Sequence, residues 1–96
     1  MRRAAKVDLN HSEIMEGVRQ AGWKARSSAA IGNDFPDQIV AKGNFTALLE
    51  VKSGSNGLTQ GQQDFIDSWP GVVVVARTVE QTVMELEKHY RELARR

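Results

Sequence analysis

The chain has 96 residues, of which 41% are hydrophobic and 26% are charged, and this predicts one compact domain, residues 1–96, with a modest core. The 13 Lys and Arg residues against 12 Asp and Glu give a formal net charge of +1, which excludes any argument for nucleic-acid binding from overall charge. The chain has no cysteine, which excludes disulfides, thiolate metal sites and cysteine nucleophiles.

The apolar segments are short. The longest run, around VVVVA, cannot span a bilayer, and the first ten residues contain no apolar stretch typical of a signal peptide. We therefore expect a cytoplasmic protein that has no membrane partner.

The first predicted element is a helix in LNHSEIMEGVRQAGW, where apolar residues recur at helical spacing. Asn10 is a suitable N-cap for this helix, and Gly22 is a suitable stop. The next segment, KARSSAAI, is short and partly alternating, so we expect a strand there.

Two stronger strand patterns follow, PDQIVAK and NFTALLEVK, and they meet at Gly43 and Asn44. Glycine and asparagine both tolerate positive φ, so this pair favours a two-residue hairpin turn. The turn fixes the register of the hairpin, and in that register Asp37 lies directly opposite Glu50.

A loop, SGSNG, separates this hairpin from a second predicted helix in LTQGQQDFIDSWPG, with Thr59 as its N-cap. The run VVVVA predicts a short buried strand, and TVEQTVMELEKHYRELARR predicts a last helix with one apolar stripe. The predicted order is α-β-β-β-α-β-α, which favours an α/β layer structure with a mixed sheet.

Two carboxylates on one sheet face need a compensating cation. Directly opposed side chains have Cβ atoms about 5 Å apart, and like charges at that separation are destabilising. Lys52 lies on the same face as Glu50, because strand side chains alternate. A hard divalent cation such as Mg²⁺ is the other candidate, since it prefers carboxylate and carbonyl oxygens.

Pro36-Asp37, followed by Glu50-Val51-Lys52 on the next strand, resembles the motif of the PD-(D/E)XK nuclease superfamily. The placement of the motif on two paired strands strengthens the match.

Two further residues extend the resemblance. With Glu13 on the preceding helix and Gln62 at the opening of the next one, the chain resembles the VRR-NUC branch, including its small phage-type members. The resemblance covers residues 13–75. It implies a restriction-endonuclease-like core, with a mixed central sheet flanked by helices.

The resemblance also implies an activity. The expected protein is a Mg²⁺- or Mn²⁺-dependent endodeoxyribonuclease, structure-specific for branched DNA such as Holliday junctions and acting as a homodimer. A phage-encoded member would act in the host cytoplasm. The alternatives are a general nicking or flap-type phage nuclease and a nucleic-acid-binding module of the same fold that does not cut.

Roles for the motif residues follow from the same resemblance. Asp37 and Glu50 would ligate the metal, and the carbonyl of Val51 could add a ligand. Lys52 would orient or activate the attacking water and stabilise the developing negative charge.

Two roles are open for each of the two helix residues. Glu13 could reach the metal from the first helix, and Gln62 could hold the lysine, a water or a phosphate. Both also fit capping boxes, because Asn10-x-x-Glu13 and Thr59-x-x-Gln62 have the required spacing. Capping and site roles can coexist.

A structural interpretation also exists for the motif itself. Asp37 and Glu50 could form a surface salt-bridge cluster with Lys52. Asp34 is interpreted as a turn residue, and the histidines are given no role.

Contact with DNA would have to come from local basic clusters, because the net charge is near zero. These clusters lie near the first helix (Arg2, Arg3, Lys6, Lys24, Arg26) and at the end of the last one (Arg91, Arg95, Arg96). No base-reading motif is visible, so we expect recognition of backbone and shape. We expect the stripe of the last helix to hold the homodimer in part.

Overall fold

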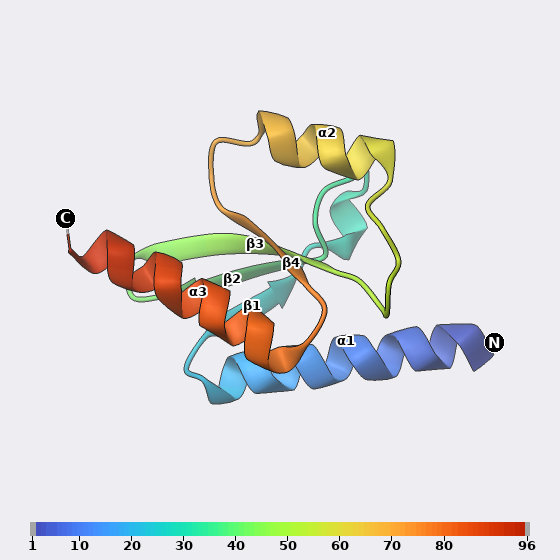
Figure 1. The fold of residues 1–96 in the computed structure, drawn as a ribbon, viewed down its shortest axis with the longest axis horizontal. Helices are drawn as coiled ribbons and strands as arrows, with labels where there is room; N and C mark the ends of the chain where they lie inside the picture. Colours follow the sequence, from blue (N-terminus) through green and yellow to red (C-terminus); the bar gives the residue numbers. More distant parts are fainter. Residues whose placement is uncertain (1, 96) are drawn as a thin grey trace.

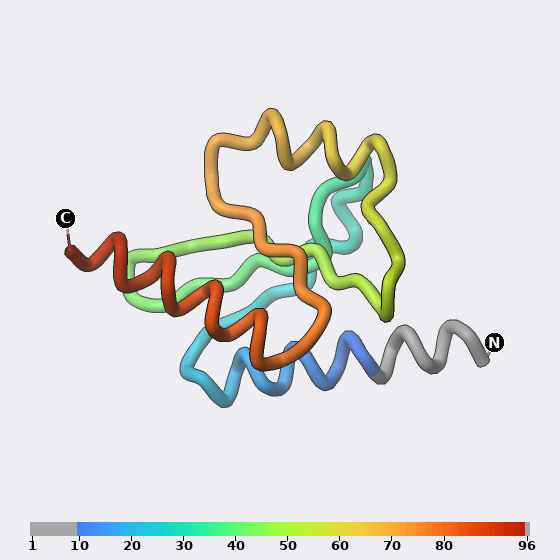
Figure 2. The backbone as a smooth tube through the Cα atoms, viewed as in Figure 1, coloured from blue at the N-terminus to red at the C-terminus, as the bar shows by residue number. Residues whose placement is uncertain are grey.

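The computed structural model describes residues 2–95, with side chains for residues 10–95 (Figure 2). Its elements in chain order are α1 (Arg2–Gln20), β1 (Lys24–Ser27), the short 3-10 helix η1 (Ala29–Ile31), β2 (Gln38–Lys42), β3 (Phe45–Val51), α2 (Gln60–Ser68), β4 (Val73–Ala76) and α3 (Val79–Ala94). The predicted mixed α/β order is confirmed, and η1 is an addition to it.

The four strands form one open mixed sheet in the order β1-β2-β3-β4. Strands β1, β2 and β3 are antiparallel neighbours, and β4 runs parallel to β3. Figure 1 shows α1 and α3 on one side of this sheet and α2 on the other. The parallel pairing brings the carboxyl ends of β3 and β4 to the same end of the sheet.

The hairpin between β2 and β3 has the predicted register. Lys42 pairs with Phe45 across the turn, and the ladder continues to Gln38 opposite Leu49. Gly43 has a φ of 58°, a left-handed conformation that glycine adopts without strain. The next pair in this register is Asp37 and Glu50, so the prediction that the two carboxylates face one another rests on a confirmed register.

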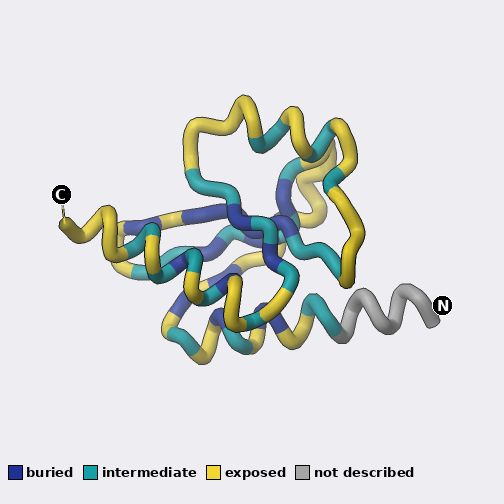
Figure 3. Tube along the Cα trace, viewed as in Figure 1, coloured by how far each residue is buried: buried dark blue, intermediate teal, exposed yellow. Residues whose placement is uncertain are grey.

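The core lies on the face of the sheet that α1 and α3 cover (Figure 3). Alternate residues of β3 from Phe45 to Leu49 are buried there, in contact with a cluster that includes Ile14 and Val18 of α1 and Leu86 of α3. This alternation is the pattern of a strand with one face in a hydrophobic core. The core therefore occupies one side of the sheet.

The apolar stripe of α3 belongs to this core. Leu86 is fully buried, while Val79, Val83 and Tyr90 are partly buried against the core cluster. Leu93, at the C-terminal end of the stripe, is 37% exposed. The stripe thus packs largely in the protein's own core, and its part in a homodimer stays a prediction.

Helix α2 covers the other face lightly, and none of its residues is buried. Phe65 stacks on Trp69 with ring centroids 5.0 Å apart, and Phe35 meets both rings edge-on. The predicted N-cap is confirmed, because the Thr59 side chain accepts a hydrogen bond from the backbone N–H of Gln62. Aromatic contacts and polar contacts at its N-terminus therefore hold α2, rather than core burial.

Helix α1 begins at Arg2, well before the predicted start. Asn10 consequently lies inside the helix, and the capping-box alternative for Asn10 and Glu13 is wrong. The Asn10 side chain instead donates a hydrogen bond to the carbonyl of Lys52, at 3.2 Å. The basic residues expected before the first helix lie within α1, and their side chains are outside the described residues.

No helix within residues 2–95 is both long enough and apolar enough to cross a membrane.

Candidate metal centre

Asp37 is held at the start of β2 by two sets of contacts. Its carbonyl accepts a hydrogen bond from the backbone N–H of Ser28 at 2.8 Å, and the Ser28 hydroxyl donates to the carbonyl of Pro36 at 2.7 Å. Its carboxylate Oδ2 accepts from the backbone N–H of Val51 at 2.9 Å. These contacts fix the carboxylate against the end of β3, where the motif continues.

Glu50 points from β3 to the face of the sheet that α2 covers. The residue is only 5% exposed, and its Oε2 accepts a hydrogen bond from Nε2 of Gln62 at 3.1 Å. Nζ of Lys52 lies 3.9 Å from the same oxygen. The structure therefore brings together four of the predicted residues, Asp37, Glu50, Lys52 and Gln62.

Burial raises the pKa of the Glu50 carboxyl from 4.5 to about 7. The negative charge of Asp37 is the next largest cause, and hydrogen bonding with Asp37 and the charge of Asp34 act in the same direction. The Lys52 ammonium lowers this pKa but does not outweigh the other effects. Without a further cation, the two carboxylates lack sufficient compensating charge, and Glu50 retains a proton over part of the neutral pH range.

The geometry disfavours the alternative of a surface salt-bridge cluster. The side chains of Lys52 and Glu50 are only 14% and 7% exposed, so the pair lies below the surface. Their 3.9 Å separation is long for a charge-assisted hydrogen bond, which is normally about 2.8 Å. A buried and loosely paired carboxylate is a poor source of stability.

Gln62 has the predicted capping role and, in addition, a contact with Glu50 that was not predicted. Its backbone N–H and its Oε1 form the capping box with Thr59, whose backbone N–H lies 2.9 Å from Oε1. Its Nε2 is left to donate to Glu50. One side chain thus starts α2 and fixes the orientation of the buried carboxylate.

The backbone of Lys52 is also fixed on both sides. Its N–H donates to the carbonyl of Ala76 at the end of β4, at 2.9 Å, and its carbonyl accepts from Asn10 of α1. Sequence reasoning missed Asn10, because its spacing to Glu13 suggested a helix start. No local signal in the sequence indicated a contact with a loop so distant along the chain.

Asp34 is a second residue that sequence reasoning missed. It has a φ of 66°, which agrees with its predicted place in a turn, yet its charge also raises the pKa of Glu50. A Cβ atom on Gly61, in the first turn of α2, would collide with the Asp34 carboxylate. Gly61 was the signal in the sequence. Glycine is disfavoured inside a helix, so its presence there indicates that another group approaches the helix closely.

Glu13 lies apart from this group. It is exposed on α1, and within the described residues it forms no hydrogen bond or ion pair with Asp37, Glu50 or Lys52. The described part of the chain also holds no cluster of three or more His, Cys, Asp or Glu side chains that could bind a metal ion. The described acidic set is therefore a pair, with Asp34 near it.

A pair of carboxylates still fits a Mg²⁺-type cation. Mg²⁺ sites commonly use one or two carboxylates, with waters and substrate phosphate oxygens completing the coordination. Asp37 and Glu50 each accept N–H donors on one oxygen, and the second oxygen of each accepts none from the described residues. The negative charges of Asp37 and Asp34, which contribute to the raised pKa of Glu50 after burial itself, would attract a cation to this position.

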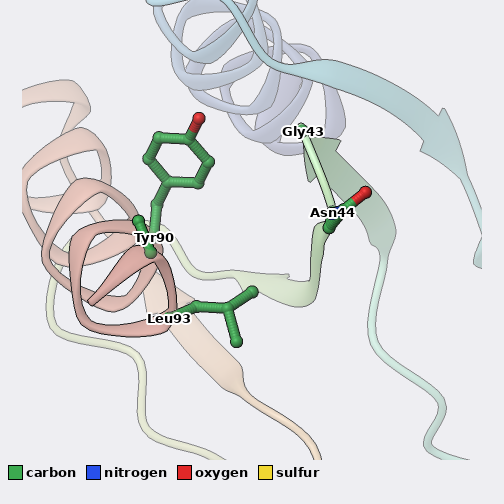
Figure 4. A pocket seen from close by; sticks show the side chains of 5 residues that line it. Gly43, Asn44, Tyr90 and Leu93 are labelled. Carbon is green, nitrogen blue, oxygen red and sulfur yellow. The ribbon is translucent and has the colours of Figure 1, made fainter. Parts of the chain in front are cut away.

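The hollow drawn in Figure 4 lies elsewhere. It measures about 270 Å³ and is formed by the hairpin turn at Gly43 and Asn44 and by the end of α3, where Tyr90 and Leu93 point toward it. It contains no carboxylate and lies at the opposite end of β3 from Glu50. We therefore do not assign the motif chemistry to it.

No protein-family model, no curated protein and no solved structure matches this chain. The class established by the structure is thus a mixed α/β domain with a four-stranded open sheet. Any functional interpretation depends on the geometry around Glu50.

Proposed function

We propose that this chain is a Mg²⁺- or Mn²⁺-dependent DNA endonuclease with a restriction-endonuclease-like fold, which cuts branched DNA such as Holliday junctions. The observation that carries the proposal is the convergence of Asp37, Glu50 and Lys52 at the end of one hairpin, in the order of the PD-(D/E)XK motif. The mixed sheet, with helices on both sides, supports the fold part of the proposal.

Each residue has a distinct task in this proposal. Asp37 and Glu50, with the carbonyl of Val51, hold the cation. When bound, the cation supplies a water of lowered pKa and neutralises charge on the phosphodiester. Lys52 would orient the attacking water and stabilise negative charge on the phosphate. Gln62 keeps the Glu50 carboxylate in position through its 3.1 Å hydrogen bond.

One observation favours a second candidate, a nucleic-acid-binding module that does not cut. Glu13 is exposed, and the described residues offer no third carboxylate, histidine or cysteine side chain to a cation beside the pair. A site of two carboxylates would then bind metal weakly. This candidate and the nuclease predict different results with the same substrates.

The test is a cleavage panel with a four-way junction, a flap and a linear duplex, each with Mg²⁺, Mn²⁺ or EDTA. We expect metal-dependent cutting with preference for the junction. Preference for the flap, or equal nicking of all three, would favour the general nuclease. Binding without cutting in either metal would overturn the nuclease in favour of the binding module.

The variant E50Q should reduce cutting by about 1,000-fold, because a lost metal ligand removes several kcal/mol of transition-state stabilisation. The matched control is E87Q, the same chemical change on α3 beneath the other face of the sheet, and it should cut normally. Cutting retained by E50Q would place the catalytic site elsewhere.

Metal binding can be tested without activity. A ligand that binds the folded state at 100 times its Kd stabilises it by about 2.7 kcal/mol, so Mn²⁺ should raise the melting temperature of the wild type but not of D37N. The variant E13Q tests the predicted ligand on α1. A lost shift in E13Q assigns Glu13 to the cation, and a retained shift removes it from the ligand set.

We also propose a homodimer, since a domain of 96 residues has little surface with which to hold a duplex and a twofold pair presents two sites to two strands. Light scattering at micromolar concentration measures the mass directly. A clean monomer would favour nicking or flap cutting over paired cuts at a junction.

A further inference from the structure

Part of the sheet face that carries Glu50 is left open by α2, and two basic side chains occupy it. Lys24 and Arg26 are both exposed on β1, and neither forms an ion pair within the described residues. With Ile39 and Ala41 of β2 they line a hollow of about 250 Å³. Within the part of the chain that the structure describes, neither cation has an acidic partner, so both are available to an external anion.

The strand register relates this basic pair to the candidate metal centre. Arg26 pairs with Ile39, which is two residues from Asp37, so these side chains lie on one face. Strands lie about 4.8 Å apart and rise about 3.4 Å per residue, so the backbone of Arg26 is about 8 Å from that of Asp37. Lys24 lies about 7 Å further along β1. The two cations therefore form a row that leads away from the carboxylates.

We propose that Lys24 and Arg26 hold the backbone of the DNA strand that extends from the phosphate bound at Asp37 and Glu50. This proposal rests on the proposed function, and it identifies which basic cluster contacts the DNA. Nucleic-acid backbones carry one negative charge per phosphate, and their affinity for proteins comes largely from Lys and Arg contacts. The open face thus presents positive charge to the phosphates of a strand that extends from the Asp37–Glu50 site.

The hydrogen-bonding state of Arg26 agrees with this assignment. Within the described residues, its guanidinium makes one hydrogen bond, a local contact of 3.3 Å to the carbonyl of Ala25. The remaining N–H donors of the planar group are available to phosphate oxygens, which arginine binds in bidentate geometry. Lys24 adds a point charge beside it.

The rival cluster lies on the wrong side of the sheet. Arg91 and Arg95 belong to the end of α3, the helix that packs with α1 over the opposite face. Arg91 also acts on its own helix, where its charge contributes to lowering the pKa of Glu87. A strand bound at Glu50 would not reach these residues without crossing the edge of the sheet.

The experiment measures binding of a fluorescent four-way junction by anisotropy in EDTA, at several KCl concentrations. For K24Q/R26Q, the slope of log K against log salt should become shallower by about 1.8, because each lost phosphate contact changes it by about 0.9. Affinity near 0.1 M salt should fall about tenfold or more. The control R91Q/R95Q removes the same charge from α3 and should change neither quantity.

Two further measurements separate charge from structure. The variant K24R/R26K keeps both charges and should keep the salt slope, while far-UV circular dichroism checks that the β1 variants are folded. In cleavage assays K24Q/R26Q should raise KM with little change in kcat, because the pair does not contact the reacting phosphate.

The outcomes distinguish this inference from the nuclease proposal. If K24Q/R26Q binds the junction as the wild type does, or R91Q/R95Q loses as much affinity, the inference is overturned even if the wild type cuts DNA. If the wild type never cuts but K24Q/R26Q still loses affinity and salt slope, the basic row stands and the nuclease fails. A wild type that does not bind DNA overturns the inference.

Discussion

The two faces of the sheet differ in what they bury. Under α1 and α3 the buried side chains are mostly apolar, and Val18, Leu49 and Leu86 are fully inaccessible. Under α2 the sheet buries Glu50 beside Lys52, and the covering helix contributes no buried residue. Adjacent residues of one strand, Leu49 and Glu50, thus enter opposite environments, since successive strand side chains alternate between faces.

This difference shows how a small domain can keep a buried carboxylate. Burying an ionised group lowers stability unless its partners compensate fully, and Lys52 compensates Glu50 incompletely. The apolar face must supply the stability that the polar face lacks. The comparison can be sharpened by making the same change on each face.

Two neighbouring leucines give the largest expected contrast. Leu49 is 0% exposed in the core cluster, and Leu48 is 5% exposed on the α2 face. We expect L49A to lower the free energy of unfolding by about 4 kcal/mol and L48A by about 2 kcal/mol, because the lightly packed face can relax around the lost volume. Urea unfolding followed by circular dichroism measures both. An equal or larger loss in L48A would show that α2 packs as tightly as α1 and α3.

The pH dependence of stability tests the polar face. Since the pKa of Glu50 is about 7 in the folded chain and 4.5 normally, the folded state keeps a proton that the unfolded state loses between these values. Without divalent cations, stability should therefore fall as pH rises from about 4.5 to 7, by on the order of 2 kcal/mol.

The control is E50Q, which resembles the protonated acid. It should lack this fall and exceed the wild type in stability at pH 8. Urea unfolding in EDTA at several pH values measures the effect. A fall of equal size in E50Q would assign the titration to another group.

The same substitution on the apolar side gives the smallest expected effect. Glu87 Oε2 accepts hydrogen bonds from Lys42 Nζ at 2.8 Å and from Trp23 Nε1 at 3.0 Å, and the bond to Lys42 is the main cause that lowers its pKa. E87Q should lower stability by about 1 kcal/mol at neutral pH. Because the folded pKa is lowered, this difference should disappear as pH falls below the usual value of 4.5.

Urea unfolding of E87Q and the wild type at pH 7 and at pH 3 measures this difference. A difference that persists at pH 3 would indicate lost packing rather than lost charge.

Local sequence rules predicted the parts of the site that local geometry fixes. The turn at Gly43 and Asn44 set the register that brings Asp37 near Glu50, and the capping box of Thr59 and Gln62 set the start of α2. Both depend on residues a few positions apart. Turn and cap chemistry act at that range.

The remaining features depend on contacts between distant segments. The spacing of Asn10 and Glu13 imitates a capping box, but residues 2–9 contain no glycine or proline, and α1 continues through them. The approach of Asp34 to Gly61 depends on how the η1 loop and α2 meet. Periodicity and spacing do not encode such tertiary contacts, so the place of Glu13 and the role of Asp34 were beyond sequence reasoning.

Gln62 both caps α2 and orients Glu50, so the geometry of the candidate centre depends on the first turn of α2 remaining helical. Because α2 buries none of its residues, its opening is expected to need less free energy than the opening of the sheet. Each time the first turn unwinds, Glu50 loses the amide that orients it. Mild heat or low urea should therefore inactivate the candidate centre while the strands are still paired. Hydrogen exchange at the first turn of α2 would report how often this turn opens.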